Sequence, residues 1–307
     1  MTDWAVAITP PGWRRWLLAE TPQSRTQARL GRAYLGWVRF ARNPLAMLGL
    51  AIFIILIVFA LAAPIVAPQN PNAGDLGQRL LPPGGDHWLG TDQQGRDIWT
   101  RIVYGSRTTL LIIFLVAVTA APIGVAIGAT AGYLGGWVEG VLMRITDAFL
   151  AFPRLVLALA FAAALGPGIE NAVLAIALTA WPPYARIARA ETLTVRHTDY
   201  VAAARISGAS GIRILMGHIM PMCMPSLIVR VSLDMAGVIL IAAGLGFLGL
   251  GVAPPQAEWG KMVSDGRELI LNQWWVCTYP GIAIFIVSLG FNLIGDGLRD
   301  VLDPREG

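Results

Sequence analysis

Long apolar runs separated by short polar stretches make up most of the chain. A run of roughly 20 residues can cross a hydrocarbon core of about 30 Å, because a helix rises about 1.5 Å per residue. Six runs near this length are present, at Leu45–Val66, Thr108–Leu134, Val138–Leu165, Asn171–Ala185, Met222–Gly251 and Val276–Leu298. The pattern predicts an all-α polytopic membrane protein with six transmembrane helices.

The arginines orient these spans. Seven of them lie in residues 1–44, against the two acidic residues Asp3 and Glu20. An excess of arginine beside a span marks the cytoplasmic side of the membrane. We therefore expect 1–44 to be a cytoplasmic segment, followed by a permease domain at 45–298 and a cytoplasmic tail at 299–307.

Alternation along the chain then assigns the loops. It places 67–107 and 252–275 outside the cell and 186–221 inside. The inside loop contains five arginines against Glu191 and Asp199, in agreement with that placement. The tail is acidic and does not support an inside placement, but acidic residues contribute little to this rule.

Composition narrows the class of protein. Hydrophobic residues make up 55% of the chain and charged residues 14%, which is too apolar for an ordinary soluble domain. The isoelectric point is near 9.4. Because membrane topology explains the arginine excess, we expect lipid and no nucleic acid among the partners.

Local signals predict details of the spans. Pro122, Pro153 and the pair Pro182-Pro183 predict kinks, since proline lacks a backbone donor. Trp13–Leu18 predicts a short interfacial helix, and Asn43-Pro44 marks the entry to the first span.

Motifs for catalysis, cofactors and metals are absent. Gly244–Gly249 fits G-x-G-x-x-G, but inside an apolar span small residues instead let helices approach closely. The lone lysine, Lys261, precedes Met262, so no phosphate-binding P-loop exists. The histidines lie on separate loops, and Cys223 and Cys277 fall at opposite ends of their spans. We expect no catalytic, cofactor or metal site and no disulfide.

Two pairs of ionisable residues fall inside predicted spans, where such residues are costly. Arg144 and Asp147 are three residues apart, and Arg230 and Asp234 are four apart, so each pair shares a helical face. Either the pairs fix helix packing or they contact the transported substrate. The sequence favours packing and identifies no substrate-binding residue.

The polar insert Asp199–Pro221 interrupts two apolar runs. Ala202, Ala203 and Ala204 favour a helix, and Gly208 is placed to end it before a second helix at Ile212–Ile219. By itself this insert is typical of an ordinary amphipathic connector lying on the inner surface.

Other motifs change that interpretation. His87–Asp97 reads HWLGTDQQGRD and is followed by Arg101, Tyr104-Gly105 and Arg107; 254–260 reads PPQAEWG and 291–304 reads FNLIGDGLRDVLDP. Together with Asp199–Pro221, these segments resemble the second (C-type) permease of dipeptide, oligopeptide and nickel ABC importers. The resemblance covers roughly residues 45–305.

The resemblance implies a fold and a set of partners. It implies the type I ABC-importer permease fold, a second homologous permease subunit, two cytoplasmic ATPases and an extracytoplasmic solute-binding protein. ATP and Mg²⁺ would be used by the partners, so the chain would not be an enzyme. It would lie in a bacterial cytoplasmic membrane with both termini inside.

In this family, the loop resembling Asp199–Pro221 is the EAA loop, which docks into the ATPase. The resemblance therefore assigns docking to Tyr200, Ala202, Ala203, Ala204, Arg205, Gly208 and Pro221. Ala202 replaces the frequent Glu of the family, and Met222 replaces a frequent Asn. We expect Arg205 and backbone groups to make more of the polar contact.

The cargo is not determined by these motifs. Di- or oligopeptides are the first expectation, and nickel, glutathione or another small solute is the alternative within the family. A stand-alone secondary transporter or channel is the competing class, and it would need no ATPase.

Overall fold

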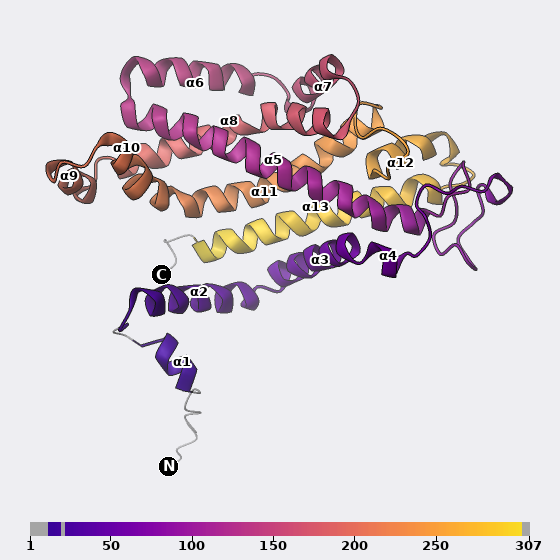
Figure 1. Cartoon of the computed structure of the whole chain (residues 1–307), viewed down its shortest axis with the longest axis horizontal. Coiled ribbons are helices and arrows are strands. Elements are labelled where there is room, and N and C mark those ends of the chain that lie inside the picture. The colour runs from indigo at the N-terminus through magenta and orange to yellow at the C-terminus, as the bar shows by residue number, and fades with distance from the viewer. Residues whose placement is uncertain (1–11, 20–21, 303–307) are drawn as a thin grey trace, which may run out of the picture.

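The computed structural model describes residues 12–19 and 22–302, which form an elongated bundle of helices running along one axis (Figure 1). Within these ranges the chain contains helices and no β-strand apart from isolated bridges. The prediction of an all-α polytopic protein is confirmed.

Four of the predicted spans are long apolar helices. They are α3 (Pro44–Leu61), α5 (Ile98–Leu134), α11 (Met220–Phe247, continuous with the turns from Gly211) and α13 (Trp275–Leu302). In the described part of the chain, these four have the length and hydropathy to cross a membrane by themselves. A fifth crossing results if the bent pair α6 and α7 counts as one span.

The span predicted at Val138–Leu165 is not one continuous helix. The structure has α6 (Gly136–Leu150) and α7 (Arg154–Leu165), which meet at 90°. The break falls at Ala151–Pro153, where proline removes a backbone donor and excludes helical geometry from the preceding residue. Pro122, Pro182 and Pro183, in contrast, lie within continuous helices.

The span predicted at Asn171–Ala185 is part of the longer helix α8 (Ile169–Val195). By length and hydropathy, α8 is not among the candidate spans. Its polar second half, from Arg186 to Thr194, dilutes the apolar run. The total of six crossings therefore stays a prediction.

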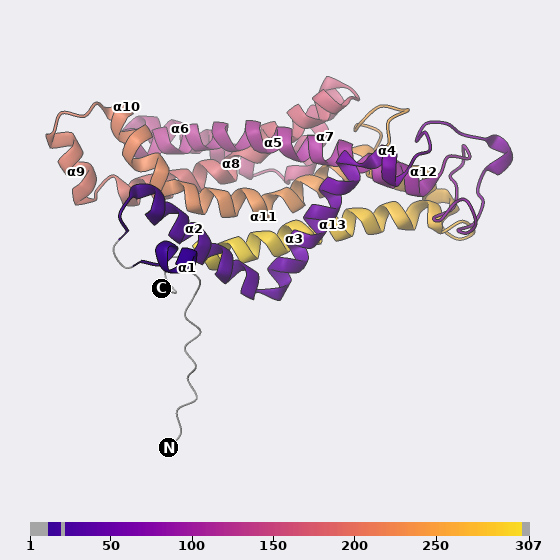
Figure 2. The same cartoon turned by 60° about the horizontal axis from the view of Figure 1, so that its bottom comes forward.

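Helices α5 and α8 form the most extensive pair in the bundle and lie side by side in both views (Figures 1 and 2). Gly124, Gly128 and Gly132 of α5 face the backbone or side chains of α8 so closely that an added Cβ would collide with them. Small residues at four-residue spacing allow such close approach. This glycine stripe was not singled out from the sequence.

At the end of the bundle that carries α9 (Asp199–Ile206), the N-terminal part is helical. The expected interfacial helix is α1 (Gly12–Leu17), and the longer α2 (Arg25–Arg42) follows it. Asn43 caps α3 through its side chain, which accepts hydrogen bonds from Leu45 N and Ala46 N, with Pro44 in the first turn. The predicted boundary at Asn43-Pro44 is confirmed.

The opposite end is more regular than the predicted loops 67–107 and 252–275. It contains α4 (Ala63–Val66), the 3-10 turn Leu76–Gln78, α12 (Trp259–Gly266) and the 3-10 turn Arg267–Leu269, and α5 already begins at Ile98. The turn Leu76–Gln78, α5 and α12 are capped by Asp75, Asp97 and Glu258, so their starts need no apolar run.

Candidate functional site

The loop between α8 and α11 begins with the short helix α9, which Gly208 ends. Gly208 has φ +79°, and its N–H donates to Arg205 O at 3.0 Å, while Ala209 N donates to Ala204 O at 3.1 Å. This pair of bonds is the Schellman motif, which a glycine with positive φ closes without strain. The predicted role of Gly208 is confirmed.

The second predicted helix, Ile212–Ile219, is not separate. Residues Gly211–Ile214 form α10, Leu215–Ile219 form a π-helical turn, and α11 continues from Met220. Since α8 also extends to Val195, the part of the predicted loop 186–221 that lies between the two long helices is shorter than expected. Motion of α9 is therefore connected to a continuous helix on its C-terminal side.

One buried residue fixes α9 against the bundle. Val201 is fully buried in a cluster with Ile214, Ile219 and Cys223. The ring of Tyr200 lies 5.1 Å from the ring of His218. A buried contact on one face and exposed residues on the other make α9 a rigid projection of the bundle.

The opposite face of α9 is open. Ala202, Ala203 and Arg205 are exposed, Tyr200 is 55% exposed and Ile206 is 88% exposed. Ile212 is 78% exposed just beyond the turn. The described chain therefore leaves both isoleucines uncovered. The sequence prediction missed Val201 and Ile206, although both flank the predicted alanines.

The predicted coupling residues therefore divide into two groups. Tyr200, Ala202, Ala203, Ala204, Arg205 and Gly208 lie together on α9 and its terminating turn. Pro221 lies apart from them, in the first turn of α11. Its exposed position after the π-helical turn makes it part of the helix start rather than of the projection.

The intrahelical charge pairs predicted from the sequence are wrong in their partners. Asp147 pairs with Arg186 of α8 at 2.7 Å, and both side chains are more than half exposed. Among the described residues, Arg144 forms no ion pair. Spacing within one helix cannot show a residue on a neighbouring helix, which is why the pattern missed Arg186.

Asp234 is also partnered across helices. Its Oδ1 accepts from Arg154 Nη1 of α7 at 2.6 Å, and its Oδ2 accepts from the Tyr184 hydroxyl of α8 at 2.8 Å. The Asp234 side chain is 6% exposed and that of Arg154 is 23% exposed. Arg230 forms no ion pair in the described chain, and its buried Nε has no hydrogen-bond partner. The arrangement is a three-helix clamp and supports the packing interpretation.

The family signature at 87–107 builds the opposite end of the bundle. Asp97 caps α5 through Oδ2, which accepts from Thr100 N at 2.7 Å. Its Oδ1 forms a second hydrogen bond, with His87 Nδ1 at 3.0 Å. Arg96 Nε donates to Asp92 at 2.7 Å, and Arg107 Nε donates to Ala60 O at 2.6 Å. The bonds of Asp97 fix the connecting segment at the start of α5, and the bond from Arg107 ties α5 to α3.

The second signature, 254–260, completes this end. Trp259 Nε1 donates to Ile102 O at 3.1 Å and packs where Gly105 leaves room. Glu258 is buried and caps α12 by accepting from Gly260 N and Lys261 N, each at 2.7 Å. Burial raises the pKa of Glu258 to about 7, partly opposed by those two bonds.

The metal-ligating side chains of the described residues are dispersed. Within 12–19 and 22–302, no three His, Cys, Asp or Glu side chains gather closely enough to hold a metal ion. Cys223, which is buried, and Cys277 are both free thiols.

Comparison with known proteins places this architecture in a family. Residues 124–307 match the family described as binding-protein-dependent transport system inner membrane component. Residues 33–83 match the N-terminal TM domain of oligopeptide transport permease C.

Curated relatives align over most of the chain. The probable D,D-dipeptide transport system permease protein DdpC of Escherichia coli K12 is 45% identical, over 94% of this chain and 96% of its own length. The dipeptide permease DppC of Alkalihalophilus pseudofirmus is 43% identical, over 86% and 87%. The nickel permease NikC of Escherichia coli K12 is 41% identical, over 84% and 93%.

These matches agree with the apolar helices and with the projecting helix α9. The chain belongs to the family of binding-protein-dependent transport system inner membrane components and is a multi-pass permease subunit of an ABC importer.

Proposed function

We propose that this permease imports short peptides and that α9 couples it to a cytoplasmic ATPase. The observation that carries the coupling proposal is the two-sided character of α9, with Val201 fully buried and Ile206 88% exposed. A helix anchored on one face and open on the other transmits motion from a partner into the bundle without bending.

The subunits required follow from this role. We propose a second homologous permease subunit, two ATPases that bind ATP and Mg²⁺, and a solute-binding protein at the α12 end. The chain itself has no catalytic site in this scheme. Its α9 end, with both termini, would face the cytoplasm, and α8 and the pair α6–α7 would each cross the membrane to give six crossings.

The docking part of this proposal has a direct test. We expect Arg205→Glu and Ile206→Asp each to reduce co-purification of the ATPase with the permease and to reduce ATP-dependent uptake. Leu271→Asp is the matched control for ATPase co-purification, because Leu271 is 93% exposed near α12, at the end of the bundle away from α9. Unchanged co-purification and uptake in both α9 variants would overturn the coupling role.

The proposal of a peptide substrate rests on relatives named as parts of dipeptide transport systems, such as DdpC and DppC. The nickel relative NikC has a similar identity, so nickel is the second candidate. Calorimetry of the partner binding protein with dipeptides, longer peptides and Ni²⁺ separates the two. Binding of a peptide supports the proposal, and binding of Ni²⁺ alone replaces it.

A further inference from the structure

A groove opens between α2 and the last turns of α13. Its volume is about 790 Å³ and its walls also include Leu50 of α3 and Pro225 of α11. On the α2 side it is lined by Trp37 and Phe40, whose rings stack at 6.1 Å, and on the α13 side by Ile294, Leu298 and Val301. A groove of this size and lining suits an apolar chain.

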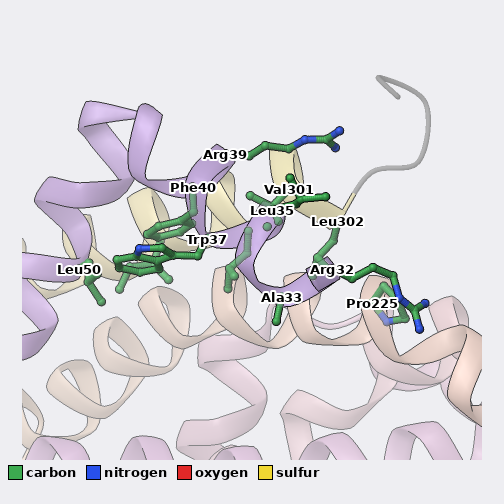
Figure 3. A pocket seen from close by; sticks show the side chains of 13 residues that line it. Arg32, Ala33, Leu35, Trp37, Arg39, Phe40, Leu50, Pro225, Val301 and Leu302 are labelled. Atoms are coloured by element: carbon green, nitrogen blue, oxygen red, sulfur yellow. The ribbon is translucent and has the colours of Figure 1, made fainter. Parts of the chain in front are cut away.

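The charged residues of the groove are cationic. Arg32 and Arg39 are its charged lining residues, and Figure 3 shows both extending from α2 at the margin, Arg39 away from the apolar side chains and Arg32 past Pro225. They are seven residues apart, so they lie on the same face of the helix, two turns from each other. Asp300 of α13 accepts a hydrogen bond from Asn43 at 3.1 Å and does not line the groove.

Among the described residues, the guanidinium groups of Arg32 and Arg39 are free of acidic partners and can bind an anion. In the described part of the chain, neither Arg32 nor Arg39 forms an ion pair, and both are exposed. Arg25, Arg29 and Arg42 extend the charge along α2, which has no acidic residue. A helix with this excess of arginine attracts anionic groups at a membrane surface.

The surroundings resemble a membrane interface. Leu30, Leu35 and Trp37 of α2 are each about half exposed, and Trp13 and Trp16 of α1 are similarly exposed. Aromatic and arginine side chains beside exposed leucines are typical of helices lying in the headgroup layer. The α2 helix leads directly into the span α3, which fixes its depth there.

We propose that this groove binds an anionic phospholipid, with an acyl chain along Trp37, Leu298 and Val301 and the phosphate at Arg32 or Arg39. The lipid holds α2 against the end of α13, on the same end of the bundle as α9. Its assignment to the cytoplasmic leaflet rests on the proposed orientation; the binding itself does not.

Native mass spectrometry of the assembled transporter in detergent, titrated with phosphatidylglycerol or phosphatidylethanolamine, tests this site. The probe variant is Arg32→Gln/Arg39→Gln, and the matched control is Arg25→Gln/Arg29→Gln on the same helix outside the groove. We expect the probe variant to bind phosphatidylglycerol about 30-fold more weakly, the factor for two arginines at about 1 kcal/mol each. The control should lose clearly less affinity, because Arg25 and Arg29 add to the charge of α2 and do not line the groove.

A second variant tests the acyl chain. Ala33 lines the groove and is exposed, so Ala33→Trp fills the space while keeping both arginines. We expect it to reduce binding of both lipids.

Three results would overturn the proposal. These are equal losses in the probe and control variants, no preference for phosphatidylglycerol in the wild type, or crosslinking of Ala33→Cys to the second permease subunit without bound lipid. Since lipid binding is measured without transport, its failure is distinguishable from failure of the proposed import function.

Discussion

Arg154 and Asp234 meet at 2.6 Å although 80 residues separate them in the chain. The contact ties the first residue of α7, just after the break at Pro153, to the middle of α11. Tyr184 of α8 donates to the same carboxylate, so one buried acid holds three helices. The bent segment α6–α7 is thereby fixed to the helix that continues from the coupling loop.

Removing this acid should destabilise the permease strongly. Asp234→Ala leaves Arg154 and the Tyr184 hydroxyl without their acceptor, and breaking a buried pair costs roughly 3 kcal/mol or more. Denaturant unfolding in detergent measures the loss. Asp147→Ala is the control, because its pair with Arg186 is more than half exposed and should be worth less than about 1 kcal/mol. Similar losses in the two variants would contradict the clamp.

Replacing glycine by alanine should have opposite effects in the close contact of α5 with α8 and on the open surface of α6. Gly128→Ala places a methyl group against the backbone of Ala185 on α8, and such overpacking costs about 1–3 kcal/mol. Gly140→Ala in α6 meets no atom within 4 Å, so the better helix propensity of alanine should stabilise by up to about 1 kcal/mol. Melting temperatures of the two variants should shift in opposite directions. A neutral Gly128→Ala would show that α5 and α8 are less closely packed.

Glu258 predicts a pH dependence of stability. Its pKa of about 7 in the folded protein exceeds the unfolded value of 4.5, so folding favours the protonated form. Stability from this group is full below about pH 4.5 and is lost as the pH rises to about 7, by on the order of 3 kcal/mol. The melting temperature of the wild type should therefore fall between pH 5 and pH 8 by more than that of Glu258→Gln. Parallel pH profiles would contradict the raised pKa.

Substituting Val201 should uncouple uptake from ATP hydrolysis while the docking residues of α9 remain. Val201→Ser removes apolar contact from the cluster that anchors α9, while Arg205 and Ile206 remain in place. We expect ATP-dependent uptake to fall several-fold while the ATPase still co-purifies, because α9 then moves independently of the bundle. The measurement compares uptake with the ATP hydrolysis rate. Uptake that remains proportional to hydrolysis, as in the wild type, would show that the anchor is not needed.

Apolar length and local capping signals were sufficient to predict much of the fold. The runs at α3, α11 and α13 are long and contain few charged residues, and Gly208 ends α9 as its position after the alanines predicted. These features depend on local sequence only. The start of α5 at Ile98 was missed because its first turns are polar and partly charged, and Asp97 rather than hydropathy determines it.

The contacts between helices could not be predicted in the same way. Arg230 and Asp234 share a face of α11, yet the partner of Asp234 is Arg154 on another helix. Periodicity reports which residues share a face and not which helix lies opposite. Gly124, Gly128 and Gly132 did carry a usable signal for the α5–α8 contact, since small residues at four-residue spacing favour close packing.

We propose that ATPases docked at α9 drive import through this chain. Uptake of radiolabelled dipeptide into proteoliposomes tests it most directly, comparing the full transporter, the same complex with a hydrolysis-deficient ATPase, and this permease chain alone. We expect accumulation against a gradient only in the full transporter supplied with ATP and binding protein. Accumulation by the chain alone, or by the hydrolysis-deficient complex, would contradict the claim.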